Sequence, residues 1–552
     1  MEVKLTDCYT LSEGKALMSG TEALVRLLLE QSRIDRMNGL RTKGLVSGYP
    51  GSPLGGLDIA LGKAKSFLDE EGIYFQPAVN EELAATALWG SQHINLYDNP
   101  SVQGVFSMWY GKGPGLDRAM DALRHANQGG VAPHGGMVIA VGDDPTGKSS
   151  TLAYQSDQNF HSLGIPYFFP KNVSEIIPMG LEAFALSRYS GCCVGLKIVV
   201  DTADSNAVVD MSRLRPNFPK MKPNKLVHVT KHDPAGARES KLHEIRLPEV
   251  QKWCAKSENA VQIYLPVKKG KTRLGIIGVG KIANEINEAL ITLLPDGGKS
   301  NTVAFTALNM PWPLPEQSLS DMLSIAEEVL VIEEKRSFVE DQIAKICVKK
   351  DRNMLLSGKT NPDGENLLPS YGELSLENII NVIAERASHH SIELNPLKEL
   401  SLVKKLDEIP VRQPYYCAGC PHNSSTKASD GEIVGMGIGC HSISGFINPD
   451  TITNFTQMGG EGAFWIGRAP FSERSHSFQN MGDGTYAHSG YLGVRAAVAA
   501  GVNITFKMLV NDAVAMTGGQ SAQGGSSPFS MAQQLLAEGV KKVVIVSDQP
   551  DQ

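Results

Sequence analysis

The sequence predicts an α/β protein with two parallel-sheet domains separated by another α/β domain. Helical periodicity, as in "EALVRLLLEQSRI", alternates with short apolar strands such as "VQGVFSMWY" and "GMVIAVG". Strands that alternate with helices form parallel sheets covered on both faces. The 55 glycines are about a tenth of the 552 residues, above the usual share of about 7%. This excess is typical of a chain with many tight strand-to-helix turns. The 552 residues are too many for a single hydrophobic core.

The first domain is predicted at residues 1–213, with strands in "GLVSGYP", "VQGVFSMWY", "GMVIAVG" and "CCVGLKIVV". Residues 214–270 are rich in proline and lysine, which is typical of a long connection with some local structure. The α/β pattern resumes with "TRLGIIGVGKIANEINEALITLL" and "EEVLVIEEK", and it predicts a second domain at residues 271–385. A polar linker at residues 386–413 leads to a third domain at residues 414–552.

The last residues, "KKVVIVSDQPDQ", contain an apolar run that predicts a strand with no helix after it. We therefore expect a fragment of a longer polypeptide, cut inside or just after the third domain. A further domain of the same polypeptide is then an expected partner.

Charge and hydropathy argue against two classes of partner. The formal net charge is −7 and no basic run is present, which argues against nucleic acid and anionic membrane surfaces. The first residues lack a secretory signal, and no uncharged apolar stretch reaches the roughly 18 residues of a membrane span. We expect a cytoplasmic protein.

A glycine–aspartate–glycine turn, Gly482-Asp483-Gly484, follows a predicted strand of the third domain. The next strand, "NITFKMLV", ends just before Asn511, and a helical segment lies between the two strands. Asp483 and Asn511 are therefore expected at the carboxyl ends of neighbouring parallel strands, where open α/β sheets bind ligands. Their oxygens and the main-chain carbonyl of Ala513 could share one Mg²⁺ with diphosphate oxygens, as in a thiamine diphosphate site. The alternative is an ordinary strand-to-helix turn.

Three stretches around this turn, "QMGGEGAFWIGRAPF", "GDGTYAHSG" and "NDAVAMTGGQ", resemble the 2-oxoacid:ferredoxin oxidoreductases, in particular the long fused bacterial form of indolepyruvate:ferredoxin oxidoreductase. The resemblance also covers the rest of the chain. It implies a thiamine-diphosphate-binding fold, with a pyrimidine-binding domain at 1–213, a transketolase C-terminal-like domain at 271–385 and a diphosphate-binding domain at 414–552. It assigns to the diphosphate-binding region the residues Thr517, Gly518, Gly519 and Gln520.

Three of the eight cysteines, Cys417, Cys420 and Cys440, cluster in the third domain. Their spacing suits a zinc site with His422 or His441 as fourth ligand as well as an iron–sulfur cluster. The resemblance implies a [4Fe–4S] cluster, and the adjacent thiamine site favours it because electrons that leave the substrate need a nearby acceptor. A cubane needs four thiolates, and the resemblance implies that the fourth lies beyond residue 552.

The first domain contains the segments that the resemblance places at the other end of the coenzyme. "QPAVNEELAATALWGSQ" is similar to the family segment whose glutamate hydrogen-bonds the aminopyrimidine ring, and we assign that role to Glu81, with Glu82 as the alternative. "GYPGSP" is similar to the loop at the substrate end, where Ser52 is a candidate donor to the 2-oxoacid. An acidic helix start and a structural proline–glycine turn are the other interpretations of these motifs.

Two further motifs have the letters of nucleotide sites. "GDDPTGKS", residues 142–149, matches a phosphate loop, but Asp143 and Asp144 would repel phosphate and Pro145 has no N–H to donate. This stretch resembles a loop of the pyrimidine-binding domain, with Lys148 as a surface lysine. "GVGKIA" matches a dinucleotide motif, but a lone match is weak evidence, and the segment is similar to the transketolase-like domain.

The resemblance implies oxidative decarboxylation of an aryl-pyruvate, of the indolepyruvate type, with coenzyme A. The products would be an arylacetyl-CoA and electrons passed through the cluster to ferredoxin, and the enzyme would be a homodimer. His488 could shuttle protons or be an interior structural histidine. The alternatives are a non-redox thiamine diphosphate decarboxylase or carboligase, which would not use the three cysteines, and a phosphate-loop triphosphatase.

Overall fold

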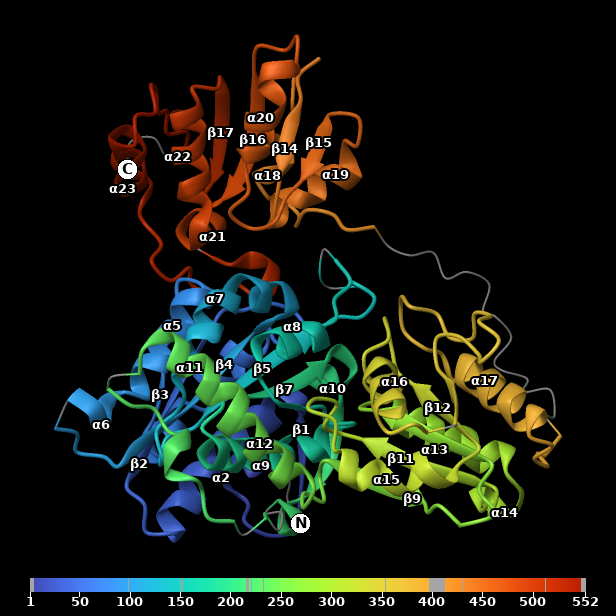
Figure 1. Ribbon diagram of the computed structural model, residues 1–552. Coiled ribbons are helices and arrows are strands. Elements are labelled where there is room, and N and C mark those ends of the chain that lie inside the picture. Colours follow the sequence, from blue (N-terminus) through green and yellow to red (C-terminus); the bar gives the residue numbers. More distant parts are fainter. Residues whose placement is uncertain are drawn as a thin grey trace. The chain divides into compact units, whose positions relative to one another are not determined.

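The computed structural model describes residues 4–547 except 98, 149, 151, 215–217, 220, 232, 353, 397–412, 430 and 512. Figure 1 shows two compact units, formed by the described residues of Met1–Pro77 with Glu81–Leu400 and by those of Ala78–Asn80 with Ser401–Gln552. Most of the predicted linker 386–413 lies outside the described residues. Among the helices that the structure describes, none is long and apolar enough to cross a membrane.

A six-stranded parallel sheet is the centre of the first unit, with strand order β3-β2-β4-β5-β7-β6. Its strands are β2 Thr42–Gly48, β3 Ile73–Phe75, β4 Gly104–Lys112, β5 Met137–Asp143, β6 Tyr167–Phe168 and β7 Val194–Val199. β5 and β7 are buried along their whole length, as expected for central strands covered on both faces. The predicted parallel sheet of the first domain is confirmed.

Helices pack on this sheet in two pairs, α2 with α9 and α5 with α7. The main helices are α2 Gly20–Met37, α3 Leu57–Lys63, α4 Lys65–Glu70, α5 Glu81–Ser91, α7 Gly113–Gly129, α8 Asp157–Leu163, α9 Val173–Ser190 and α10 Val200–Asp204. α2 begins at a capping box in which Ser19 and Glu22 each accept a hydrogen bond from the other's main-chain N–H. An antiparallel ribbon of β1 Lys15–Ser19 and β8 Asn206–Asp210 places the first and last strands of the domain side by side.

The segment 214–270 packs on the first domain and supplies a strand to the second. It contains α11 Ala235–Lys241, α12 Leu247–Cys254 and β9 Val261–Leu265. The buried Arg246 donates hydrogen bonds to main-chain oxygens at the end of α7, those of Asn127, Gln128 and Gly129. Trp253 of α12 donates to the Glu182 carboxylate of α9 at 2.8 Å. The segment is thus fastened to two helices of the first domain.

β9 is the antiparallel edge strand of a second sheet, whose order is β13-β12-β10-β11-β9. The other strands are parallel, namely β10 Leu274–Val279, β11 Val303–Leu308, β12 Glu328–Ile332 and β13 Leu355–Ser357. The main helices here are α13 Ile282–Leu293, α15 Glu316–Ile325, α16 Val339–Lys349 and α17 Leu376–His389. α13 and α17 pack together over a core that includes Leu274, Phe305 and Ile383.

The second unit contains a four-stranded parallel sheet with the order β15-β14-β16-β17. Its strands are β14 Val434–Met436, β15 Ile452–Phe455, β16 Ser477–Gly482 and β17 Ile504–Leu509. Its helices include α18 His422–Ser425, α19 Ser444–Ile447, α20 Ala463–Arg468, α21 Asp483–Thr485, α22 Tyr491–Ala500 and α23 Pro528–Ala537. This second parallel sheet was also predicted, and it carries the glycine–aspartate–glycine turn at the end of β16.

The strand predicted near residue 545 is wrong for the part of it that the structure describes. Residues 541–547 form no strand, and Val544, Ile545 and Val546 are exposed at 66%, 48% and 90%. A strand needs a neighbour for its main-chain N–H and C=O groups. An apolar run without such a neighbour does not become a strand.

Candidate functional site

The ends of β16 and β17 bring the predicted magnesium ligands together. Asp483 directly follows Gly482, the last residue of β16, which runs parallel to β17. The Asp483 carboxylate accepts hydrogen bonds from the Gly484 N–H at 2.8 Å and from the Asn511 N–H at 2.9 Å. The side-chain oxygen of Asn511 in turn accepts from the Ala513 N–H at 3.2 Å. The hydrogen bond from the Asn511 N–H to Asp483 joins two strand ends. The residues expected to bind magnesium through their oxygens therefore lie next to each other.

The loop that follows Asn511 closes on itself at residues 514–520. Val514 and Gln520 form an isolated bridge, the Thr517 hydroxyl donates to Gln520 Oε1 at 2.8 Å, and Gln520 Nε2 donates to the Thr517 carbonyl at 3.0 Å. Gly518 and Gly519 have φ angles of +126° and +78°, a region that strains residues with a Cβ. The two glycines, which have no side chains, therefore permit a tight loop directly after the expected magnesium ligands.

The three clustered cysteines belong to the same unit as this turn. The Cys420 N–H donates to the Cys417 carbonyl at 3.0 Å, so these two residues form one turn. Burial raises the pKa of Cys440, and the thiols of Cys420 and Cys417 raise that pKa further because nearby thiolates would repel each other. The Cys417 and Cys420 thiols thus lie near enough to Cys440 to act on its charge. Cys417 is exposed, whereas the other two are half-buried.

Two histidines near these cysteines are the alternative zinc ligands. His441 is buried, and its Nε2 already accepts a hydrogen bond from the Gly437 N–H at 3.1 Å. Burial lowers the pKa of His441 to about 4 and also lowers the pKa of His422. Among the residues described, no cysteine belongs to a trio of ligand atoms within 4.8 Å of one another.

Glu461 is a buried carboxylate with a place in this site that no sequence motif assigned. It is fully buried, and its oxygens accept from the Gly459 N–H at 2.7 Å and from the Ile438 N–H at 3.3 Å. A methyl group added at Gly437 would lie 2.1 Å from Glu461 Oε1. Glu461 thus joins the "GGEG" turn to the loop that leads from β14 to Cys440. Its signal in the sequence is an acidic residue between glycines.

Burial distinguishes the two glutamates at the start of α5. Glu81 is 5% exposed, whereas Glu82 is exposed. The Glu81 carbonyl accepts a hydrogen bond from Trp109 Nε1 of β4 at 3.0 Å, and a methyl group at Gly115 would lie 2.9 Å from Glu81 Oε1. The Glu81 carboxylate is therefore held against the start of α7.

The "GYPGSP" loop leaves β2 at the same edge of the sheet. β2 and β4 are neighbours, and both end at this edge. Ser52 is half-buried in the loop, and a methyl group at the preceding Gly51 would lie 2.8 Å from the Cδ atom of Lys112. Ser52 and Glu81, the candidate substrate donor and ring partner, thus both lie near the carboxyl ends of β2 and β4.

Comparison with known proteins gives one consistent family. Residues 266–409 match the family model of the indolepyruvate oxidoreductase domain. Indolepyruvate oxidoreductase subunit IorA of Pyrococcus abyssi is 26% identical, over 98% of this chain and 82% of the relative. The same subunit of Methanothermobacter marburgensis is 26% identical, over 95% of this chain and 79% of the relative. The chain is similar to the indolepyruvate oxidoreductases.

This relationship confirms the resemblance drawn from the motifs and the enzyme class, an oxidoreductase. The solved structure of a 2-oxoglutarate:ferredoxin oxidoreductase from Magnetococcus marinus, with 2-oxoglutarate, coenzyme A and succinyl-CoA bound, is also similar. It has a TM-score of 0.49 and 17% identity, over 68% of this chain and 65% of that chain.

The phosphate-loop motif of the first domain is closed by one of its own carboxylates. Asp144 accepts hydrogen bonds from the main-chain N–H groups of Gly147 at 2.9 Å, Lys148 at 3.2 Å and Ser150 at 3.1 Å. These are the donors that a phosphate would need. Lys148 is exposed and lies 3.5 Å from Glu373. The geometry therefore argues against the triphosphatase.

The dinucleotide-like turn at the end of β10 is covered by the first domain. Gly280 has a φ of +57°, and a methyl group there would lie 2.1 Å from Cδ1 of Phe169. The next residue, Lys281, forms an ion pair with Asp201. Because Phe169 occupies the space in front of the turn, the main chain cannot approach a pyrophosphate as the motif requires.

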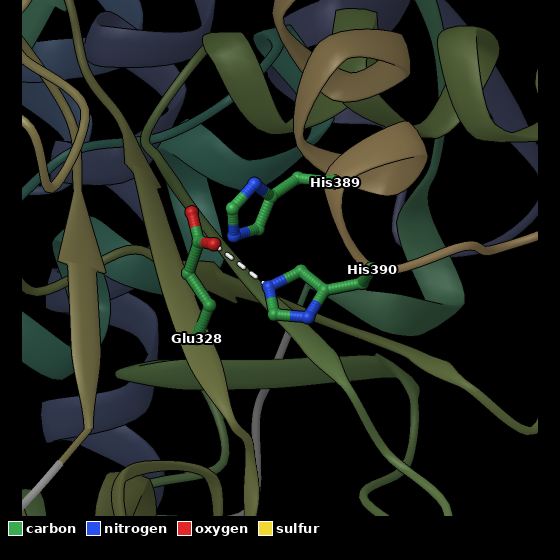
Figure 2. A group of neighbouring side chains, drawn as sticks. All are labelled: Glu328, His389 and His390. Carbon is green, nitrogen blue, oxygen red and sulfur yellow. Dashed lines mark hydrogen bonds and ion pairs between the residues drawn. The ribbon is translucent and has the colours of Figure 1, made fainter.

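Figure 2 shows Glu328, His389 and His390, whose potential ligand atoms lie within 4.8 Å of one another. Glu328 is fully buried and accepts from Arg386 at 2.8 and 2.9 Å, from Ser357 at 2.6 Å and from His390 at 2.8 Å. The Arg386 guanidinium already neutralises this carboxylate, so a metal ion would have to displace a buried cation. The group is an ion-pair cluster that ties α17 to β12.

Proposed function

We propose that the chain catalyses the thiamine-diphosphate-dependent oxidative decarboxylation of aryl-pyruvates of the indolepyruvate type with coenzyme A, and that the electrons pass through a [4Fe–4S] cluster to ferredoxin. The observation that carries this proposal is the contact between Asp483 and Asn511 at two neighbouring strand ends. The three coupled cysteines belong to the same unit. The relatives' name, indolepyruvate oxidoreductase, supports the substrate class.

The donors at this edge fit a magnesium-bound diphosphate. Carboxylate, amide and main-chain oxygens, here from Asp483, Asn511 and Ala513, are the hard ligands that Mg²⁺ prefers. Asp483 is 8% exposed, so a cation would meet a largely desolvated charge. Residues 517–520 contribute a loop whose two glycines permit close approach to the diphosphate. When bound, thiamine diphosphate supplies a carbon nucleophile and takes up the electron pair that CO₂ leaves behind.

The residues of the chain supply position, charge and proton control in this proposal. Glu81 holds a proton at the aminopyrimidine ring, where its burial favours a hydrogen bond to the ring over one to water. Ser52 donates to the 2-oxoacid. Glu461 positions the loop that carries Cys440, because its carboxylate holds the main-chain N–H of Ile438.

Cys417, Cys420 and Cys440 are the proposed thiolate ligands of the cluster. A [4Fe–4S] cluster takes four thiolates, so a fourth ligand comes from outside this group. The relatives are named as subunits, and we propose that this chain likewise works with a further subunit or domain and as a homodimer. Residues 1–213, 271–385 and 414–552 are the proposed pyrimidine-binding, transketolase C-terminal-like and diphosphate-binding domains.

The test is an anaerobic assay of the complete protein with indolepyruvate or phenylpyruvate, coenzyme A and a viologen dye. We expect dye reduction that depends on thiamine diphosphate and Mg²⁺. Asp483→Asn should weaken thiamine diphosphate binding by at least about tenfold, since a hydrogen bond or contact to a charged group contributes about 1.5–3 kcal/mol. The control is Asp450→Asn, an exposed carboxylate of the same unit, which should bind the coenzyme like the wild type.

Two results would contradict the proposal. Release of CO₂ without dye reduction would indicate the non-redox decarboxylase or carboligase. Equal thiamine diphosphate affinity in wild type and Asp483→Asn would remove the magnesium site.

A further inference from the structure

Lys112 is a cationic side chain at the carboxyl end of β4 that no motif assigned. It is the last residue of β4 and the N-cap of the 17-residue helix α7, and its side chain makes no capping hydrogen bond. In the part of the chain that the structure describes, its ammonium forms no hydrogen bond or ion pair. Burial lowers the pKa of Lys112, and the nearby Glu81 carboxylate opposes this shift. A half-buried lysine without a partner bears a desolvation cost that an anionic ligand would offset.

Two neighbouring groups locate this ammonium beside the proposed reaction. The stem of Lys112 passes over Gly51, where a methyl group would lie 2.8 Å from its Cδ atom, and Ser52 is the next residue of that loop. On the other side, Gly115 leaves room for Glu81. A methyl group at Gly115 would lie 2.9 Å from Glu81 Oε1. Lys112 is therefore between the loop of the candidate substrate donor and the candidate ring partner.

The N-terminus of helix α7, which begins directly after Lys112, adds positive charge to the same place. The positive end of α7 faces the carboxyl edge of the sheet, and its first turn contains Gly113, Pro114 and Gly115 rather than acidic residues. Glu81 is the acidic group that acts on Lys112. A substrate carboxylate would thus meet a lysine and a helix N-terminus together.

We propose that Lys112 binds the carboxylate of the 2-oxoacid, which deepens the proposed function and rests on it. A 2-oxoacid carries its carboxylate next to the reacting ketone, so a cation placed between Ser52 and Glu81 fixes which end of the substrate points to the coenzyme. Lys112 is then a specificity-determining residue that selects 2-oxoacids over the corresponding aldehydes and amides.

Calorimetry on the complete protein tests this without turnover. The probes are 3-phenylpropionate and its neutral analogue 3-phenylpropionamide. Wild type should prefer the carboxylate, and Lys112→Met should weaken carboxylate binding by about 10- to 100-fold while amide binding stays the same, as expected for loss of a charged hydrogen bond. Lys112→Arg should restore most of the preference. The control is Lys148→Met, which replaces an exposed lysine on the loop after β5. This variant should retain the wild-type preference for the carboxylate probe.

Each other outcome contradicts the inference. If wild type shows no preference, or if Lys112→Met keeps it, Lys112 does not bind the carboxylate. If both probes weaken equally in a folded Lys112→Met variant, with an unchanged melting temperature, the lysine acts through Glu81 or the loop instead. The viologen assay of the wild type is a separate result, and its failure would contradict the proposed function without deciding the binding comparison.

Discussion

Asp144 and Asp483 both follow a strand in a glycine-rich turn, yet their carboxylates act differently. Asp144 accepts from three N–H groups of its own loop, those of Gly147, Lys148 and Ser150. Asp483 accepts from Asn511 on the neighbouring strand end. The sequence identified the repulsion that Asp144 would cause to phosphate, but not its role, because its partners depend on how the loop folds.

We expect Asp144→Ala to lower the free energy of unfolding by about 1–3 kcal/mol, because three N–H groups would lose their acceptor. Lys148→Ala should change it by less than about 0.5 kcal/mol, since the side chain is exposed. Urea unfolding of both variants measures these values. This interpretation of the loop would be contradicted if the wild type bound ATP and the Lys148→Ala variant did not.

Strands were predictable where both faces are buried. β5 and β7 read as continuous apolar runs because helices cover both sides of the sheet. β9 was missed because it is a half-exposed edge strand with a polar residue in "VQIYL", and its pairing with β11 depends on residues far along the chain. In the candidate site, the ends of β16 and β17 were predictable from the glycine–aspartate–glycine turn and from the run "NITFKMLV" that precedes Asn511. Glu461 was not predictable, because its partners lie on two separate loops.

The Glu328–Arg386 pair fastens α17 to the second sheet, and its removal tests that role. Arg386→Leu should lower the free energy of unfolding by about 3–5 kcal/mol, because it leaves the buried Glu328 carboxylate without its cation. Arg386→Leu combined with Glu328→Leu should recover much of the loss. Urea unfolding is the measurement, and Arg336→Leu, an exposed arginine, is the control. A double variant no more stable than Arg386→Leu alone would contradict the ion-pair explanation.

At the scale of the first unit, the carboxyl ends of its two large sheets meet at a small cavity that is lined by charged side chains. Asp143 and Lys197 come from the first sheet, and Glu333 and Lys335 follow β12 of the second. The Glu333 carboxylate is buried and accepts from the main-chain N–H groups at the start of α16. This arrangement could not be predicted from the sequence, since it requires both domains in place.

Glu333 should make the stability of this unit depend on pH. Burial raises the pKa of Glu333 from 4.5 to about 7. Between these two pH values the folded state holds a proton that the unfolded state has lost. Its contribution, roughly 3 kcal/mol from the size of the shift, is fully present below pH 4.5 and is lost as pH rises through 7. Unfolding free energies of Glu333→Gln should show a shallower decline over this range than wild type. Glu377→Gln, an exposed carboxylate, should follow the wild type, and equal slopes in all three proteins would contradict the prediction.

The position of β9 in the chain has a consequence for the order of assembly. β9 is synthesised before β10 and β11, and α12, just upstream, is anchored to α9 by Trp253. We expect the first domain to fold as the nascent polypeptide emerges, so that α12 already holds this edge strand beside the folded domain when its partner β11 arrives. The finished domain thus acts as a template for the next one, and a second domain made without residues 261–265 would expose an open sheet edge prone to intermolecular pairing.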